Sequence, residues 1–279
     1  MGGALDLTRF ETSPTTVTPR APIGVFDSGV GGLSVLAALR ARLPAAPLLY
    51  VGDTAHAPYG ERDDGYVLAR CERIVRALQA RGARVIVMAC NTATAVALTQ
   101  LRLRWPNLAI VGVEPGVRPA ATLTRSGCLA VLATPATARS ARLRELIERH
   151  AAHLRVHVQA CPGLAGAIER GLLDARALAP WLGPACDAVR AAGADTVVLG
   201  CTHYPFVAQA IGRALGPETT LVDTRAAVAE RTSALWESTG VAPERADVQV
   251  YSTGATAIMA RLLNACAGLH AVSVQAIAV

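Results

Sequence analysis

Short apolar runs alternate with amphipathic stretches along most of the 279 residues, and this alternation constrains the fold more than any other feature of the sequence. The runs are rich in β-branched residues and almost continuously apolar, which is typical of strands whose sheet is covered on both faces. Strands that alternate with helices predict an α/β fold with largely parallel sheets flanked by helices. We expect strands at Ile23–Phe26, Leu48–Gly52, Val85–Ala89, Ala109–Val113, Cys128–Ala133, Val156–Ala160, Thr196–Gly200, Thr220–Asp223 and Val248–Tyr251.

Two stretches between these runs show the clearest helical periodicity. From about Gly65 to Arg81, apolar side chains lie on one stripe with Arg and Glu opposite, and Gly82 is expected to end the helix. From Ser140 to His150, the leucine and isoleucine side chains fall on one face in the same way. Both stretches therefore predict amphipathic helices that pack against a sheet.

The two halves of the chain also resemble each other. GVFDSG, which begins at Gly24, and AVLATP, which begins at Ala130, each open a strand–helix unit. VIVMACNT and VVLGCTHY occupy similar places later in their halves. Ligands of open α/β sheets bind beyond the carboxyl ends of the strands, and all four stretches are such ends. We therefore predict two similar lobes, with the active site in the cleft between them.

The basic residues exclude several classes of function. All 27 of them are arginine, so the chain has no lysine for a pyridoxal-phosphate Schiff base or for a P-loop. The net charge is +6, but the arginines are spread over the expected helices and aromatic residues make up only 4% of the chain. A nucleic-acid surface combines clustered basic residues with aromatic ones, and we do not predict one here.

The distribution of apolar residues and cysteines indicates the compartment. No apolar run approaches the roughly 18 residues that a membrane helix needs. The first twenty residues contain no apolar segment typical of a signal peptide, so we predict a polar N-terminal extension at 1–21 and a cytoplasmic location. The seven cysteines are odd in number and scattered, which predicts free thiols rather than a disulfide framework.

Two of these cysteines occur where an expected strand ends and a helix begins. Cys90 follows VIVMA and precedes Asn-Thr-Ala-Thr, and Cys201 follows VVLG and precedes Thr-His. Backbone N–H groups and the helix dipole stabilise a thiolate at such a position. His203 can exchange a proton with a nearby thiol. Zinc sites show closely spaced pairs of ligands that this chain lacks, and we predict no metal. In contrast, Cys71, Cys128, Cys186 and Cys266 are expected to be ordinary core cysteines.

A glycine-rich stretch, VFDSGVGGLSVL, follows the first expected strand. Its glycine spacing does not fit the dinucleotide fingerprint G-x-G-x-x-G. The stretch predicts instead a loop whose backbone N–H groups approach an anionic ligand at a helix N-terminus. Asp27 then acts as a proton relay or as a carboxylate that binds an amine. The alternative is that Asp27 and Ser28 only cap the helix.

Two further residues are candidates with simple structural alternatives. The sequence HAPYGER, at 56–62, contains Pro and Gly and predicts a surface loop. Tyr59 in this loop either holds a ligand by its hydroxyl or only packs. Glu169 lies in an expected helix after a Pro-Gly turn, where it either orients His203 or is a solvated helix residue.

Together, DSGVGG, DTAHAPYG, ACNTATA, VEPGV and GCTHYP occur in an order and at intervals that resemble the glutamate racemases of the cofactor-independent aspartate/glutamate racemase family. The match extends from about Pro22 to the last thirty residues. The resemblance implies two α/β lobes, with the C-terminal tail returning to the first. The first lobe would then comprise 22–116 plus 225–279, and the second 117–224.

The resemblance also implies the site. By motif, Cys90 and Cys201 are the two acid/base thiols, assisted by Asp27 and His203, with Glu169 supporting the histidine. The substrate-binding residues that it implies are Asp27, Ser28, Tyr59, Gly60, Asn91, Thr92, Thr202 and His203. No cofactor and no metal take part. The expected partner is a small-molecule substrate, glutamate, and the sequence leaves open whether the protein is a homodimer.

The presence of two thiols has a physical explanation in such an enzyme. Racemisation removes the α-proton from one face of an amino acid and returns a proton to the other, so a base and an acid are needed on opposite faces. Each group needs a pKa near the operating pH, and we expect the helix ends, with Asp27 or His203, to adjust the thiol pKa values toward it. Hydroxyl, amide and backbone N–H donors can stabilise the developing carbanion.

The leading hypothesis is interconversion of L- and D-glutamate, which supplies D-glutamate for peptidoglycan synthesis. Three alternatives remain open at this point. One is a related racemase that acts on aspartate or another small acidic substrate. Another is a hydrolase with one nucleophilic cysteine and His203, which predicts a covalent acyl intermediate. The last is a non-catalytic binding module, for which a second thiol has no purpose.

Overall fold

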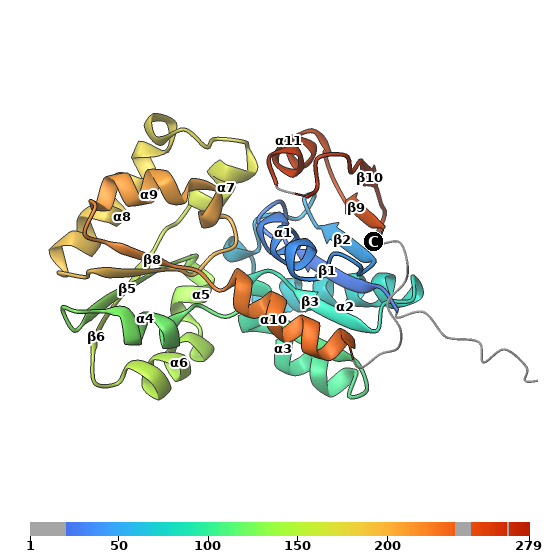
Figure 1. Cartoon of the computed structure of the whole chain (residues 1–279), viewed down its shortest axis with the longest axis horizontal. Helices are drawn as coiled ribbons and strands as arrows, with labels where there is room; N and C mark the ends of the chain where they lie inside the picture. Colours follow the sequence, from blue (N-terminus) through green and yellow to red (C-terminus); the bar gives the residue numbers. More distant parts are fainter. Residues whose placement is uncertain (1–20, 238–246, 267) are drawn as a thin grey trace, which may run out of the picture.

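The computed structural model describes residues 21–237, 247–266 and 268–279. Two parallel sheets stand side by side, each with helices around it (Figure 1). This arrangement confirms the predicted fold class. Apart from Ala21, the predicted N-terminal extension lies outside the described residues. Within them, no helix combines the length and the apolar character that crossing a bilayer requires.

The first lobe is the part of the chain built on a six-stranded sheet with the order β10-β9-β2-β1-β3-β4. All its pairings are parallel, and β1 lies at the centre beside β2 and β3. Its strands are β1 Ile23–Asp27, β2 Leu48–Gly52, β3 Val85–Met88, β4 Ala109–Gly112, β9 Val248–Ser252 and β10 Val274–Ala276. Its helices are α1 Leu33–Arg42, α2 Asp64–Ala80, α3 Asn91–Arg104, α10 Arg225–Trp236 and α11 Ala257–Ala265, with a short 3₁₀ helix η1 Tyr59–Glu61.

The second lobe is built on a four-stranded parallel sheet with the order β6-β5-β7-β8. Its strands are β5 Cys128–Ala133, β6 Arg155–Ala160, β7 Thr196–Leu199 and β8 Thr220–Val222. Its helices are α4 Val117–Leu123, α5 Pro135–Arg139, α6 Ala141–Ala151, α7 Leu164–Glu169, α8 Ala175–Ala191 and α9 Ala208–Leu215, with the 3₁₀ helix η2 Tyr204–Val207. The lobe boundaries that the resemblance implied, at 116/117 and 224/225, stay a prediction.

All nine expected strands are present, with ends shifted by at most one residue. Helix α2 begins one residue before the predicted Gly65, because the Asp63 carboxylate accepts the Tyr66 N–H and caps the helix. Ser140 caps α6 in the same way through the Leu143 N–H. Strand β10 was not predicted, since its sequence VQA is short and half exposed and its pairing to β9 uses backbone groups.

The core lies on both faces of each sheet, which explains the continuous apolar runs. In the first lobe, Val25 faces α1 and α10, and the next residue, Phe26, faces α2 and α3. In the second lobe, Leu132 faces α7 to α9, and Val131 faces α4 and α6. A strand with a helix on either side has no solvated face, so its sequence carries no alternating polar residues.

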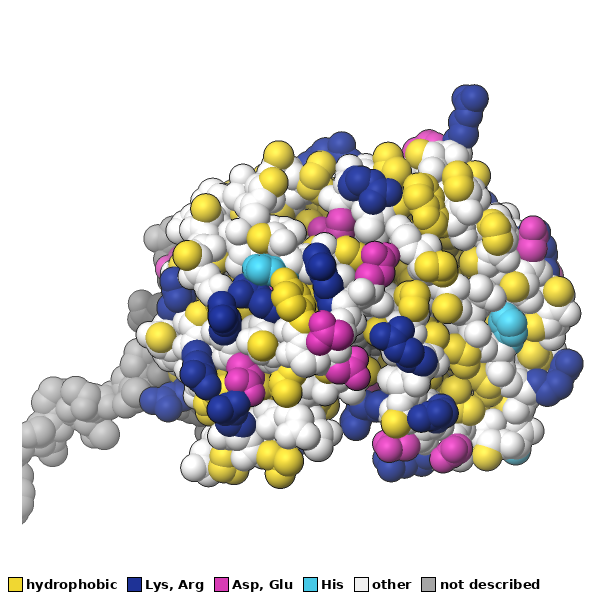
Figure 2. All heavy atoms as spheres, turned by 180° about the vertical axis from the view of Figure 1, so that it is seen from behind, with side chains coloured by type: hydrophobic (Ala, Val, Ile, Leu, Met, Phe, Trp, Pro, Cys, Tyr) yellow, Lys and Arg dark blue, Asp and Glu magenta, His cyan; other side chains and the backbone are white. Residues whose placement is uncertain are grey.

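Many arginine side chains are spread over solvent-exposed helix faces, as the sequence predicts. Arginine side chains are distributed over the face shown in Figure 2, with acidic and apolar side chains among them. Several of the cations pair with neighbouring carboxylates, as Arg42 does with Glu230 and Arg104 with Glu72. Exposed pairs of this kind contribute little to stability.

All seven cysteines are free and buried, and this gives the stability a pH dependence. Burial raises the pKa of Cys90 and Cys161 from 9.0 to about 12, and that of Cys71 well above its ordinary value. A thiol whose pKa is raised by folding stabilises the native state fully below pH 9, and that stabilisation is lost as the pH rises toward the folded pKa. We expect the free energy of unfolding to fall above pH 9 by about 1.4 kcal/mol per pH unit for each such thiol.

Urea unfolding at pH 8 and pH 10 in the presence of reductant measures this loss. Cys71→Ala is the matched control, because it removes one buried thiol outside the cavity. In this variant the decrease in the free energy of unfolding per pH unit should be smaller by the contribution of one thiol. Equal free energies of unfolding at the two pH values would contradict the prediction.

Candidate active site

The carboxyl ends of the central strands of both sheets meet at one small cavity. Its volume is about 10 Å³, which is room for a single water molecule. Every predicted site residue lines it except Asp27 and Glu169, which are hydrogen-bonded to residues near it. The lining residues are Ser28, Pro58, Tyr59, Gly60, Cys90, Asn91, Thr92, Thr134, Ala165, Cys201, Thr202 and His203.

Cys90 reaches the cavity from the first lobe, as the residue that caps α3. Its sulfur accepts the Ala93 N–H at 3.4 Å, and its thiol donates to Ser28 Oγ at 3.7 Å. Burial, with a further contribution from Asp27, nevertheless raises the pKa of Cys90 to about 12. The expected adjustment toward neutral pH is therefore wrong for this thiol in the closed site, because desolvation outweighs the helix terminus.

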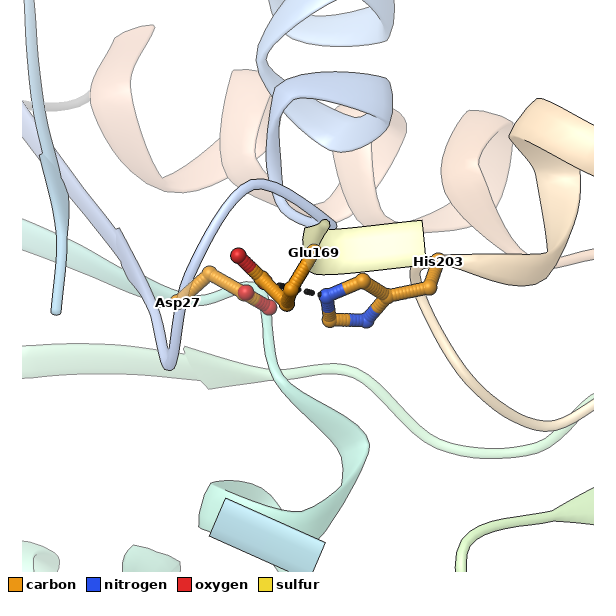
Figure 3. Close-up of side chains that lie close together, drawn as sticks. All are labelled: Asp27, Glu169 and His203. Carbon is orange, nitrogen blue, oxygen red and sulfur yellow. Dashed lines mark hydrogen bonds and ion pairs between the residues drawn. The ribbon is translucent and has the colours of Figure 1, made fainter. Parts of the chain in front are cut away.

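Cys201 reaches the same cavity from the second lobe, just after β7. Its sulfur lies 3.5 Å from Nδ1 of His203, and Nε2 of that ring lies 2.5 Å from Oε1 of Glu169 (Figure 3). Burial lowers the pKa of His203, but the interactions with Cys201 and Glu169 outweigh it and hold this pKa well above its ordinary value. The geometry thus favours a protonated imidazole ring within reach of the Cys201 sulfur.

Asp27 ends β1 and is completely buried. Its carboxylate accepts the Gly29 N–H at 2.8 Å and, across the lobe interface, the hydroxyl of Thr202 at 2.9 Å. Burial raises the pKa of Asp27, and His203 opposes this. Helix α1 has no side-chain cap, so the alternative in which Asp27 and Ser28 only cap a helix is wrong.

Asp27, Glu169 and His203 have ligand atoms that all lie within 4.8 Å of one another (Figure 3). All three side chains already take part in hydrogen bonds. Glu169 Oε1 accepts both from His203 and from the Val30 N–H, at 2.8 Å for the latter. The cluster therefore functions as a hydrogen-bonded network between the lobes.

The loop at 56–62 differs from its prediction as a surface loop at two positions. Tyr59 and Gly60 are buried, and the Tyr59 hydroxyl donates to Oδ2 of Asp53 at 2.6 Å. Asp53 also forms a buried two-bond pair with Arg70, at 2.9 Å for both bonds. The hydroxyl of Tyr59 is thus occupied, and its ring and backbone are what remain to line the cavity.

Sequence reasoning missed two sets of residues. Thr134 and Thr137 in the second lobe bond to Thr92 Oγ1 across the interface, at 2.9 and 3.4 Å. Thr134 follows β5 directly, in the stretch AVLATP that the sequence pattern marks as a strand end, and Thr137 lies one turn further on, in α5. Asp53 likewise follows β2 directly, whereas nothing in the local sequence indicates that Arg70 is its partner.

Comparisons with known proteins agree with this geometry. Residues 33–232 match the protein family described as Asp/Glu/Hydantoin racemase. A glutamate racemase of Ectopseudomonas mendocina is 50% identical over 212 residues, which are 76% of this chain and 81% of that protein.

Two solved structures extend the agreement to the whole fold. Glutamate racemase isoform RacE1 from Bacillus anthracis has a TM-score of 0.84 at 29% identity, covering 94% of this chain and 99% of that one. Escherichia coli glutamate racemase, in complex with L-glutamate and the activator UDP-MurNAc-Ala, has a TM-score of 0.78 at 32% identity, covering 94% and 100%.

Two lobes, each built on a parallel sheet, bring one thiol apiece to one cavity, and the chain is an amino-acid racemase that belongs to the Asp/Glu/Hydantoin racemase family. Within that family it is placed with the glutamate racemases, and the resemblance seen in its motifs is confirmed. Its activity is the interconversion of L- and D-glutamate. The alternatives of a hydrolase and a non-catalytic module are set aside.

Proposed function

We propose that this racemisation proceeds by proton transfer between Cys90 and Cys201 on opposite faces of the substrate α-carbon, without a cofactor. The observation that carries the proposal is that each lobe contributes one thiol to the same cavity. A planar carbanion between two thiols can be reprotonated from either side, so the direction depends only on which thiol is ionised.

The surroundings of the two thiols differ. Cys201 lies 3.5 Å from Nδ1 of His203, a ring that can exchange a proton with it. Cys90, with its pKa raised to about 12, rests as the protonated acid. For one enantiomer, the Cys201 thiolate removes the α-proton and the Cys90 thiol donates its own. This leaves Cys90 as the thiolate and Cys201 as the thiol, which is the state that acts on the other enantiomer.

Polar groups around the cavity suit the charged groups of glutamate. Ser28, Thr92 and Thr202 offer hydroxyls for the carboxylates, and these can stabilise the carbanion as negative charge moves onto the α-carboxylate. Among the described residues, Asn91 Oδ1 is buried without a hydrogen-bond partner, which suits it to accept from the substrate ammonium group.

The cavity, of about 10 Å³, is too small to hold glutamate. We therefore infer that the lobes separate to bind substrate and close to exclude water from the carbanion. In the cell, a cytoplasmic enzyme with this activity supplies D-glutamate for peptidoglycan synthesis.

The test is ¹H NMR in D₂O with L-glutamate and no added cofactor, with optical rotation followed in parallel. Loss of the α-proton signal together with loss of rotation is the expected result. Exchange with aspartate in place of glutamate would leave the mechanism and change the substrate. Loss of rotation while the α-proton is retained would overturn the two-thiol mechanism.

A further inference from the structure

One peptide group, between Gly29 and Val30, is held from both lobes. Its carbonyl oxygen accepts the hydroxyl of Tyr50 at 2.7 Å, and its N–H donates to Oε1 of Glu169 at 2.8 Å. The two atoms belong to one rigid plane, so rotation of this peptide would break both bonds together.

Two glycines of the first lobe leave space for the hydrogen bond between the Gly29 carbonyl and Tyr50. A Cβ at Gly52 would lie 2.7 Å from that oxygen, and a Cβ at Gly32 would lie 2.9 Å from the Tyr50 hydroxyl. Both contacts are closer than a real Cβ tolerates, so two glycines make room for this bond. Tyr50 itself lies in the middle of β2 and is completely buried.

From this peptide, hydrogen bonds continue to a catalytic thiol. Glu169 Oε1 lies 2.5 Å from His203 Nε2, and His203 Nδ1 lies 3.5 Å from the Cys201 sulfur. Tyr50 does not line the cavity, so it acts on the reaction only through these groups.

We propose that Tyr50 is a positioning residue for the Cys201 side of the reaction. The Tyr50 hydroxyl fixes the orientation of the Gly29–Val30 peptide, so that the Val30 N–H points toward Glu169 when the lobes close. Glu169 then orients the His203 ring toward Cys201. The position of Cys201 and His203 in the second lobe then depends on Tyr50, which belongs to the first lobe. This inference rests on the proposed roles of Cys201, His203 and Glu169.

A double-mutant cycle separates this role from simple core packing. Tyr50→Phe keeps the ring that fills the core and removes only the hydroxyl. We expect kcat to fall about 10-fold in the wild-type background and less than about 2-fold in the Glu169→Ala background, where the acceptor of the Val30 N–H is gone. The KM for glutamate should stay within about 2-fold of the wild-type value, because the contacts that bind the substrate in its ground state are unchanged.

Tyr251→Phe is the matched control. Tyr251 pairs in register with Val51 on the neighbouring strand, and its hydroxyl donates to Gln249 Oε1 at 2.7 Å, away from the cavity. Its removal should leave kcat unchanged in both backgrounds.

The outcomes are distinct. An unchanged kcat for Tyr50→Phe would overturn the positioning role. So would an equal fold-decrease in kcat in both backgrounds, because a smaller fraction of folded, active enzyme lowers kcat by the same factor in each. If Glu169→Ala alone left kcat at the wild-type value, the proposed role of Glu169 in the mechanism would fail, and the positioning role with it.

Discussion

Replacing either Cys90 or Cys201 with serine is expected to lower kcat for racemisation by about 10³-fold or more. A serine hydroxyl is a far weaker acid than a thiol, so it neither ionises nor returns a proton at a useful rate. Both variants should fail in both directions, because each turnover uses one thiol as base and the other as acid. Optical rotation with either enantiomer measures the loss.

Proton exchange in D₂O makes this prediction sharper. The thiol that remains can still remove the α-proton from its own face and return a solvent deuteron to that face. We therefore expect each variant to exchange one enantiomer slowly without inversion, and the two variants to differ in which enantiomer they exchange.

Cys128→Ser is the matched control for the thiol substitutions. Cys128 is buried outside the cavity, and its thiol donates to the Ala192 carbonyl oxygen at 3.3 Å, a bond that serine can also make. This variant should racemise at the wild-type rate. Racemisation by Cys90→Ser or Cys201→Ser at more than a few per cent of the wild-type rate would refute the two-thiol mechanism.

The fold class and nine of the strands could be predicted because the signal for them is local in the sequence. Each central strand is apolar on both faces, and Val25 and Phe26 show why: neighbouring residues face different helices. Strand β10 has no such signal, since Gln275 and Ala276 are exposed and the strand is defined by its pairing with β9.

The site was predictable where a strand end marks it and not where contacts cross the lobes. Cys90 and Cys201 each follow a central strand, so position and chemistry coincide. Tyr50 reads as an ordinary strand residue, and only the fold shows that its hydroxyl meets the Gly29 carbonyl. The pKa of Cys90 was misjudged for a related reason, because the helix terminus is visible in the sequence and the extent of burial is not.

The contact between the lobes leads to the second large effect, which is expected for Gly29→Ala. A Cβ at this position would lie 1.8 Å from Oε1 and 2.4 Å from Cδ of Glu169. The backbone of Gly29 is not in the left-handed region, so alanine is tolerated there conformationally and the effect is steric. Either Glu169 is displaced from His203 or the lobes stay apart.

Both results of Gly29→Ala disturb the geometry around Cys201, and a misplacement of about 1 Å can cost about 10²-fold in rate. We expect kcat/KM to fall by about that factor, with the melting temperature nearly unchanged, since the clash lies between lobes and not within a core. Gly183→Ala is the matched control, because a Cβ in the middle of α8 meets no atom within 4 Å. Wild-type kcat/KM for Gly29→Ala would mean that catalysis does not require Glu169 to approach the Gly29–Val30 peptide, and the closed arrangement of the two lobes would then not be the one in which the proton is transferred.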